Sequence, residues 1–106
     1  MNYVGRDNSS DGPNGQAVQE AATLLHLMIR GLVDNPEEVK VDLVEGGQSV
    51  IFEVRVDRED VRRVIGRKGR TADALREIMT NLGGKAGRRY LLEIVEPMER
   101  FSVVKS

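Results

Sequence analysis

Two glycines that flank two cations form the part of this sequence best suited to chemistry. They lie in the stretch VRRVIGRKGRTADAL; the loop is Gly66, Arg67, Lys68 and Gly69, and the cations around it are Arg62, Arg63 and Arg70. Glycine lets a phosphate backbone approach closely because no Cβ intervenes. The N–H groups and dipole at the start of a following helix attract an anion. A polyanion would also relieve the repulsion among the cations, so the pattern predicts a phosphate-binding loop. A plain helix–helix turn with incidental cations has the same spacing.

Charge is distributed unevenly along the 106 residues. Residues 58–89 carry ten Arg or Lys against four Asp or Glu, whereas residues 1–57 carry four against ten. The formal net charge of −1 therefore hides a basic centre with acidic flanks. Such segregation indicates an anionic partner, although a solvated surface of mixed charge explains it equally well.

Other kinds of chemistry have little support in the sequence. GRKGRT lacks the four-residue spacer and the Gly-Lys-Ser/Thr ending of a nucleotide-binding P-loop. His26 is the only histidine and has no acid at helical contact spacing, so we expect it to be structural. The neighbouring acids, such as Glu37 and Glu38, lie where helices or strands begin, as acids often do. Without cysteine there is no thiolate ligand or cysteine nucleophile. We expect no enzyme activity, no metal and no cofactor.

Periodicity predicts the elements that position the loop. Apolar residues recur at three- and four-residue spacing from Ala17 to Leu32, which is typical of an amphipathic helix, and Pro36 ends that segment. Alternating apolar residues predict strands at 39–45 and 49–56. Gly46-Gly47 between them favours a tight antiparallel hairpin.

The second half of the chain predicts two helices and a strand around the glycine loop. Asp57 is a suitable cap for a helix that begins near Arg58. After the loop, a second helix is expected from about Arg70 to Leu82, with Gly83-Gly84 as its stop. A last strand follows at 88–95. The order α-β-β-α-α-β predicts a two-layer α+β domain, with the helices on one face of a three-stranded sheet.

The outer face of that sheet and the ends of the chain give further expectations. Ile51, Leu91 and Val95 on that face could form an apolar patch or be scattered exposed residues, and the C-terminal Phe101, Val103 and Val104 could instead cover them; the sequence does not decide among these. Residues 1–15 are predicted to be a flexible tail, 16–96 the domain and 97–106 a second tail. No stretch approaches about 18 apolar residues, and the N-terminus lacks the features of a signal peptide. A cytoplasmic protein is expected.

The motifs LVDNPEEVKV, VIGRKGRTADALR and LLEIVE, in this order and spacing, resemble a known family. They are similar to the small bacterial single-domain KH proteins of the KhpA (YlqC) type, and the likeness covers about residues 17–96. It implies a type II KH domain that binds single-stranded RNA, a GxxG loop that clamps about four nucleotides of backbone, and a role as a post-transcriptional regulator or RNA chaperone. It also implies self-association or pairing with a larger Jag-type (KhpB) protein.

The resemblance implies roles for individual positions. Gly66, Arg67, Lys68 and Gly69 match the phosphate clamp, and Ile65 matches the apolar floor of the base groove. Arg70 and Thr71 match the start of the next helix, while Val54 and Val56 would border the groove. Arg62 departs from the family, which often has a small residue there. The alternative is an interaction subunit that binds a protein partner and has weak RNA affinity of its own.

Overall fold

The computed structural model describes residues 12–97 of the chain, with side chains from residue 15 onward. It contains three helices, three strands and three short 3-10 turns in this part of the chain. The helices are α1 (Gly12–Arg30), α2 (Val61–Ile65) and α3 (Arg70–Ala86); the strands are β1 (Lys40–Gly46), β2 (Ser49–Arg55) and β3 (Arg89–Ile94); the turns are η2 (Pro36–Glu38), η3 (Arg58–Asp60) and η4 (Arg67–Gly69). The predicted order and the α+β class are confirmed.

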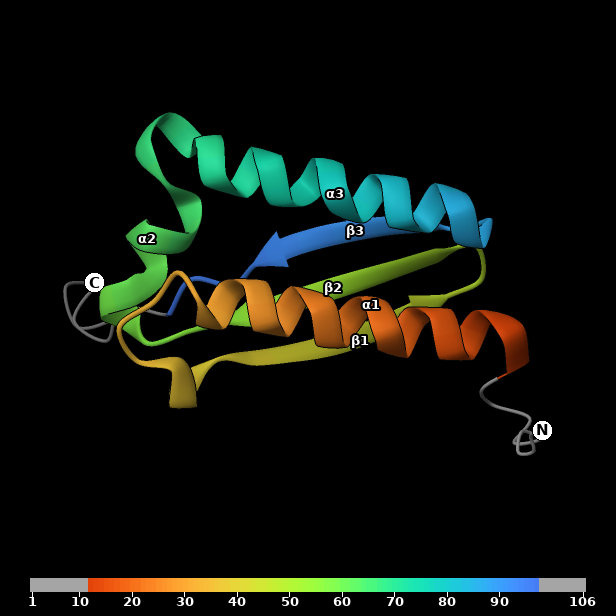
Figure 1. Ribbon diagram of the computed structural model, residues 1–106, viewed down its shortest axis with the longest axis horizontal. Helices are drawn as coiled ribbons and strands as arrows, with labels where there is room; N and C mark the ends of the chain where they lie inside the picture. Colours follow the sequence, from red (N-terminus) through yellow and green to blue (C-terminus); the bar gives the residue numbers. More distant parts are fainter. Residues whose placement is uncertain (1–11, 98–106) are drawn as a thin grey trace, which may run out of the picture.

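The sheet has the order β1-β2-β3, with an antiparallel hairpin followed by a parallel pair. Gly47 takes a φ of +57° in the tight turn between β1 and β2, as the hairpin prediction requires. The crossover from β2 to the parallel strand β3 contains α2 and α3, because a parallel connection needs a long return path. Figure 1 shows α2 and the turn into α3 at one end of the molecule, and the β1–β2 hairpin at the other.

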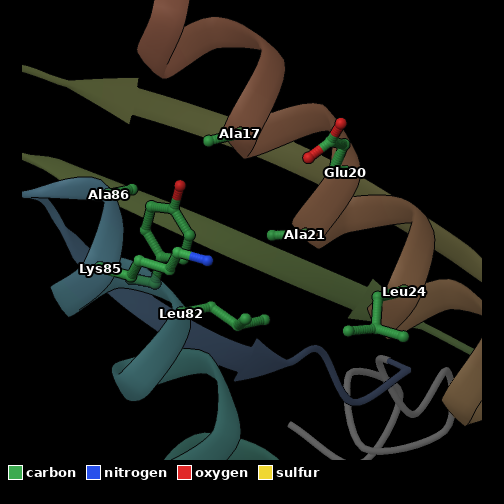
Figure 2. A pocket seen from close by; sticks show the side chains of 8 residues that line it. Ala17, Glu20, Ala21, Leu24, Leu82, Lys85 and Ala86 are labelled. Carbon is green, nitrogen blue, oxygen red and sulfur yellow. The ribbon is translucent and has the colours of Figure 1, made fainter.

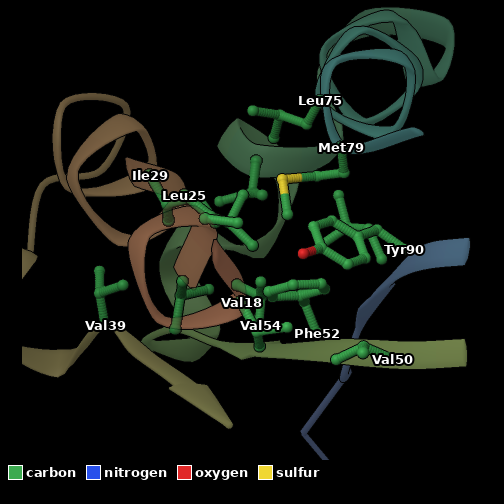
Figure 3. Packing of buried hydrophobic residues seen from close by; sticks show 14 of the residues in the cluster. Val18, Leu25, Ile29, Val39, Val50, Phe52, Val54, Leu75, Met79 and Tyr90 are labelled. Carbon is green, nitrogen blue, oxygen red and sulfur yellow. The ribbon is translucent and has the colours of Figure 1, made fainter. Parts of the chain in front are cut away.

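The core lies between the sheet and the two long helices (Figure 3). Alternate residues of the strands point into it, as the period-two pattern predicts. They meet the apolar stripes of α1 and α3; the largest fully buried side chains are Phe52, Leu25, Ile29, Met79, Val18, Val50, Val54 and Val64. Phe52 and Tyr90 pack edge to face at 4.9 Å between ring centroids. This aliphatic core holds the crossover helices, and with them the glycine loop, against the sheet.

Both long helices differ from the sequence prediction at one end. α1 begins at Gly12, inside the segment predicted as a tail, and Pro13 is tolerated there because it lies in the first turn. α3 continues to Ala86, so the predicted stop at Gly83-Gly84 is wrong. The helix ends instead at Gly87, whose φ is +76° and whose N–H bonds to the carbonyls of Gly83 and Gly84.

Gly83 has a packing role that explains its place inside a helix. A Cβ at this position would lie 2.6 Å from the carbonyl oxygen of Arg88 and 2.9 Å from the backbone nitrogen of Tyr90. α3 therefore approaches the start of β3 more closely than any other residue would permit. A Cβ at Gly84, by contrast, would meet open space.

The outer face of the sheet carries an apolar row. The strand register places Val44, Ile51 and Leu91 side by side across β1, β2 and β3. Ile51 and Leu91 belong to the predicted patch, and Val44 is a member that the sequence pattern did not reveal. Leu91 is 39% exposed and Val44 is 47% exposed. The residues predicted to cover the patch, Phe101, Val103 and Val104, lie outside the described part of the chain, as does most of each predicted tail. The domain boundaries stay a prediction. Within residues 12–97, no helix is both long and apolar enough to cross a membrane.

Candidate nucleic-acid interface

The glycine loop breaks the helix by unusual backbone angles. Gly66 has φ +80°, Lys68 has φ +56° and Gly69 has φ +74°. Three residues of positive φ out of four turn the chain sharply, and two bonds close the turn: Gly66 N donates to Arg62 O at 2.8 Å, and Gly69 N donates to Gly66 O at 3.0 Å. Lys68 is the only non-glycine residue with positive φ in the described chain. The turn leaves the side chains of Arg67 and Lys68 exposed.

Gly66 is required by a close contact as well as by its φ. A Cβ on Gly66 would lie 2.6 Å from Thr71 Cβ and 2.8 Å from Thr71 N, in the first turn of α3. A Cβ on Gly69 would have nothing within 4 Å, so only its φ favours glycine. The two glycines of the motif therefore differ: the first closes the turn against α3, while the second leaves an open approach to the loop.

A groove runs beside the loop. Its part next to the loop has a volume of about 280 Å³ and is lined by Arg62, Ile65, Gly66 and Arg67. A second part of about 450 Å³ shares Arg62 and Ile65 and is lined in addition by Arg58, Val61, Glu96 and Pro97. The two hollows adjoin one another along α2, and Arg62 and Ile65 line both; together they are the groove.

The residues that line the groove opposite α2 differ from those predicted. Val54 and Val56 were expected to border it, but Val54 is fully buried and Val56 is 8% exposed. Val54 lies in the central strand β2 and Val56 just after its end, and both side chains pack in the core. Glu96 and Pro97 line the wall instead, just after β3 ends. Figure 1 shows β3 pointing toward the end of the molecule at which α2 lies.

Asp60 anchors the base of α2 to the loop that follows α1. Its side chain is fully buried, and it accepts hydrogen bonds from Asp34 N, Asn35 N and Asn35 Nδ2, each at 3.0 Å. Burial raises the pKa of this carboxyl, but these bonds and the charge of Arg63 outweigh it, so the pKa of Asp60 is below its usual value. The stretch LVDNP, which begins one of the motifs quoted above, thus serves to hold α2 in place.

Arg63 completes this anchor. Its Nη2 lies 2.8 Å from Asp34 Oδ2, and its Nε lies 3.3 Å from Asp60 Oδ1. Its guanidinium is therefore part of the fold's anchor, and its predicted contact with phosphate stays a prediction. Among residues 12–97, four other cations near the loop have no ion pair with a described acid: Arg62, Arg67, Lys68 and Arg70. These four are exposed and are available to an outside anion.

Two further expectations concern residues outside the loop. Asp57 caps η3 as predicted, since its Oδ1 accepts from Glu59 N at 2.9 Å. His26 Nε2 lies 3.1 Å from Val39 O, which is the structural role expected of it. Among the described residues, no group of three potential metal ligands lies together.

A second hollow lies between α1 and α3, away from the loop (Figure 2). It has a volume of about 480 Å³ and is mostly apolar; its lining residues are Ala17, Glu20, Ala21, Leu24, Leu82, Lys85, Ala86 and Tyr90. Glu20 extends from α1 and Lys85 from α3. Burial raises the pKa of the Tyr90 hydroxyl, which has no hydrogen-bond partner among the described residues.

The α-β-β-α-α-β order, the mixed sheet and the GxxG turn between α2 and α3 together define a KH domain of type II topology. The family described as KhpA/KhpB, KH domain matches residues 22–94. The chain belongs to this family. The match begins ten residues after α1 starts, so the first turns of α1 lie outside it.

Curated relatives support the same assignment. The chain is 45% identical over 73 residues to a protein of Aquifex aeolicus named "RNA-binding protein KhpA", which covers 69% of this chain and 92% of that protein. It is 41% identical over 73 residues to the protein of that name from Borreliella burgdorferi, and this match covers 69% of this chain and 89% of that protein. It is 48% identical over 61 residues to the protein of that name from Mycobacterium leprae, and this match covers 58% of this chain and 76% of that protein.

Proposed function

We propose that this chain binds single-stranded RNA, with the sugar–phosphate backbone on the Gly66–Gly69 turn and bases in the groove along α2. The observation that carries the proposal is the group of four exposed cations without a described acidic partner, gathered around a glycine turn that opens onto a groove. Like charges brought this close repel one another unless an anion is bound. The relatives named RNA-binding proteins point to RNA as that anion.

The groove suits bases better than it suits phosphates. Val61 and Ile65 supply apolar contacts, and the volume is within the range of ligand sites. A single strand can place its backbone on Arg67 and Lys68 while unstacked bases enter the groove, which is how KH domains use a GxxG loop. A duplex keeps its bases stacked and paired, so it would gain only the backbone contacts. We therefore expect single strands to bind more tightly than duplexes.

Backbone amide resonances give a direct test, because glycines report from both ends of the molecule. Adding a single-stranded RNA of eight nucleotides to the ¹⁵N-labelled protein should shift the Gly66 and Gly69 signals in proportion to the RNA bound. Gly47, in the hairpin turn, and Gly87, at the end of α3, should stay unchanged and serve as internal controls. Shifts confined to Gly47 and Gly87, or no shift up to high micromolar RNA, would contradict the proposed site.

The alternative function is assembly with a second KH protein, and the exposed apolar residues of the long helices favour it. Leu24 is 43% exposed and Leu27 is 56% exposed on one face of α1, while Ile78 on α3 is 39% exposed and lies one turn before Leu82. Leu24 and Leu82 line the hollow of Figure 2, so this surface is continuous across both helices. Either a second copy or a Jag-type partner would bury it, at about 25 cal/mol per Å² before the costs of association.

Sedimentation equilibrium decides whether the chain pairs with itself. A concentration-dependent shift from 11.8 kDa toward twice that mass is expected, and Ile78→Lys should abolish it. A single 11.8 kDa species at all concentrations into the high micromolar range would exclude the homodimer. We expect no catalysis and no cofactor in either case, and the cytoplasmic location expected from the sequence stays a prediction.

A further inference from the structure

The two walls of the groove carry opposite charges. Arg62 extends from α2, and Glu96 lies on the wall formed after β3; both line the same 450 Å³ hollow, which Arg58, Val61, Ile65 and Pro97 also line. A carboxylate is an unexpected wall for a site that binds a polyanion, because it repels phosphate. It becomes favourable only if the ligand presents hydrogen-bond donors to it. The charge arrangement therefore favours a base that presents hydrogen-bond donors to the carboxylate.

We propose that this groove selects guanine, an inference that rests on the proposed RNA binding and specifies its ligand. Guanine presents two acceptors, O6 and N7, to which an arginine donates in a bidentate fork. Its other edge presents two donors, N1–H and the 2-amino group, and a carboxylate accepts from both. Adenine, cytosine and uracil each mix donors and acceptors on the edge that guanine offers to a carboxylate. Guanine alone satisfies Arg62 on one wall and Glu96 on the other.

The apolar residues that line the groove complete the fit. Val61 is buried and Ile65 is partly buried, yet both line the groove, so they can contact the face of a flat ring. Stacking of this kind accepts every base, and so discrimination must come from the two charged walls. Each of the other bases offers the Glu96 carboxylate one donor group with an acceptor beside it, so the second carboxylate oxygen would face a lone pair. Selection here therefore combines attraction of guanine with repulsion of the others.

Fluorescence anisotropy with labelled RNAs of seven uridines, in which the central position is varied, tests this inference. We expect central guanosine to bind at least about tenfold more tightly than uridine, adenosine or cytidine, as one good bidentate contact can provide. Inosine, which lacks the 2-amino group facing Glu96, and 7-deazaguanosine, which lacks the N7 acceptor for Arg62, should each lose most of the gain. Equal binding of all central bases would overturn the guanine inference alone. Failure of every RNA to bind would overturn the proposed function along with it.

Two variants separate recognition from a general electrostatic or structural effect. Glu96→Gln should weaken binding of the guanosine RNA and strengthen binding of the all-uridine RNA, because the repulsion is removed together with the paired acceptors. Arg62→Lys keeps the charge but loses the fork, so it should retain the salt dependence of binding and lose the guanine preference. If either variant changes the affinity for all RNAs by the same factor in the same direction, its wall does not read the base.

Discussion

Reversing the two charges at the tip of the loop is the sharpest test of the phosphate clamp. Arg67→Asp with Lys68→Asp replaces exposed cations that have no described acidic partner. Aspartate is one of the few residues that tolerate the positive φ of Lys68. The domain should therefore remain folded while the loop becomes acidic. The prediction is loss of RNA affinity without loss of the thermal unfolding transition.

The size of the effect follows from counterion release. Each phosphate neutralised on a single strand contributes about −0.7 to the slope of log affinity against log salt. The three cations Arg67, Lys68 and Arg70 give a slope of about −2.1 if each contacts one phosphate, so affinity should fall about twentyfold between 50 and 200 mM salt. With two contacts removed, any remaining binding should have a slope of about −0.7 and fall about threefold.

A matched control separates the loop from net charge. Lys85→Asp with Arg89→Asp makes the same change in charge near the other end of α3, about 25 Å away at 1.5 Å per residue. That distance exceeds the Debye length of about 8 Å at physiological salt. Anisotropy titrations at four salt concentrations, with melting curves for all three proteins, complete the assay. If the loop variant keeps the wild-type slope, or the control loses affinity equally, the clamp reasoning is refuted.

Three stability predictions concern residues that shape the site. Gly83→Ala should lower the free energy of unfolding by about 1–3 kcal/mol because its Cβ would meet the backbone of β3. The control Gly84→Ala should raise the free energy of unfolding by about 0.5–1 kcal/mol. Equal effects of the two substitutions in urea unfolding would disprove the contact at Gly83. Gly66→Ala should lower the free energy of unfolding more than Gly69→Ala. Alanine is strained by about 1–2 kcal/mol at either positive φ, but only the Cβ at position 66 would also overlap Thr71. Equal losses of stability in urea unfolding would mean that this overlap relaxes. Folding lowers the pKa of Asp60, so its contribution to stability is present above the unfolded pKa of about 3.9 and is lost as pH falls through the folded pKa. Asp60→Asn should therefore lower the melting temperature at pH 7 and flatten the fall of the melting temperature between pH 5 and pH 2, whereas the exposed-site control Asp42→Asn should change neither. An Asp60→Asn profile that matches the wild type would contradict the anchor.

Local patterns were sufficient to predict the elements and the loop. Period-two alternation located both hairpin strands, and the cap at Asp57 was visible because its partner Glu59 is two residues away. The glycine loop was recognisable because its residues are contiguous. The family resemblance added the type II topology, which the element order and the mixed sheet confirm.

What the sequence did not reveal depends on contacts between distant residues. Asp60 reads as an ordinary acid in a first helical turn, yet its partners Asp34 and Asn35 lie about 25 residues earlier. Gly83 reads as a helix stop because glycine is common there, whereas it is needed for the approach of β3. Glu96 reads only as the last residue of the motif LLEIVE, and the direction of β3 brings it to the groove.

The anchor at Asp60 also explains why so many cations can crowd into one short segment. Arg63 faces the domain and is neutralised by Asp34 and Asp60, at the base of α2. Within the described chain, Arg67 and Lys68 at the loop tip have no ion pair. The fold uses one arginine of the cluster to fix α2 and presents the others to solvent. Because the anchor holds α2 and the glycine turn holds the start of α3, we expect an anion to bind with little rearrangement, so that less of the binding energy is spent on ordering the loop.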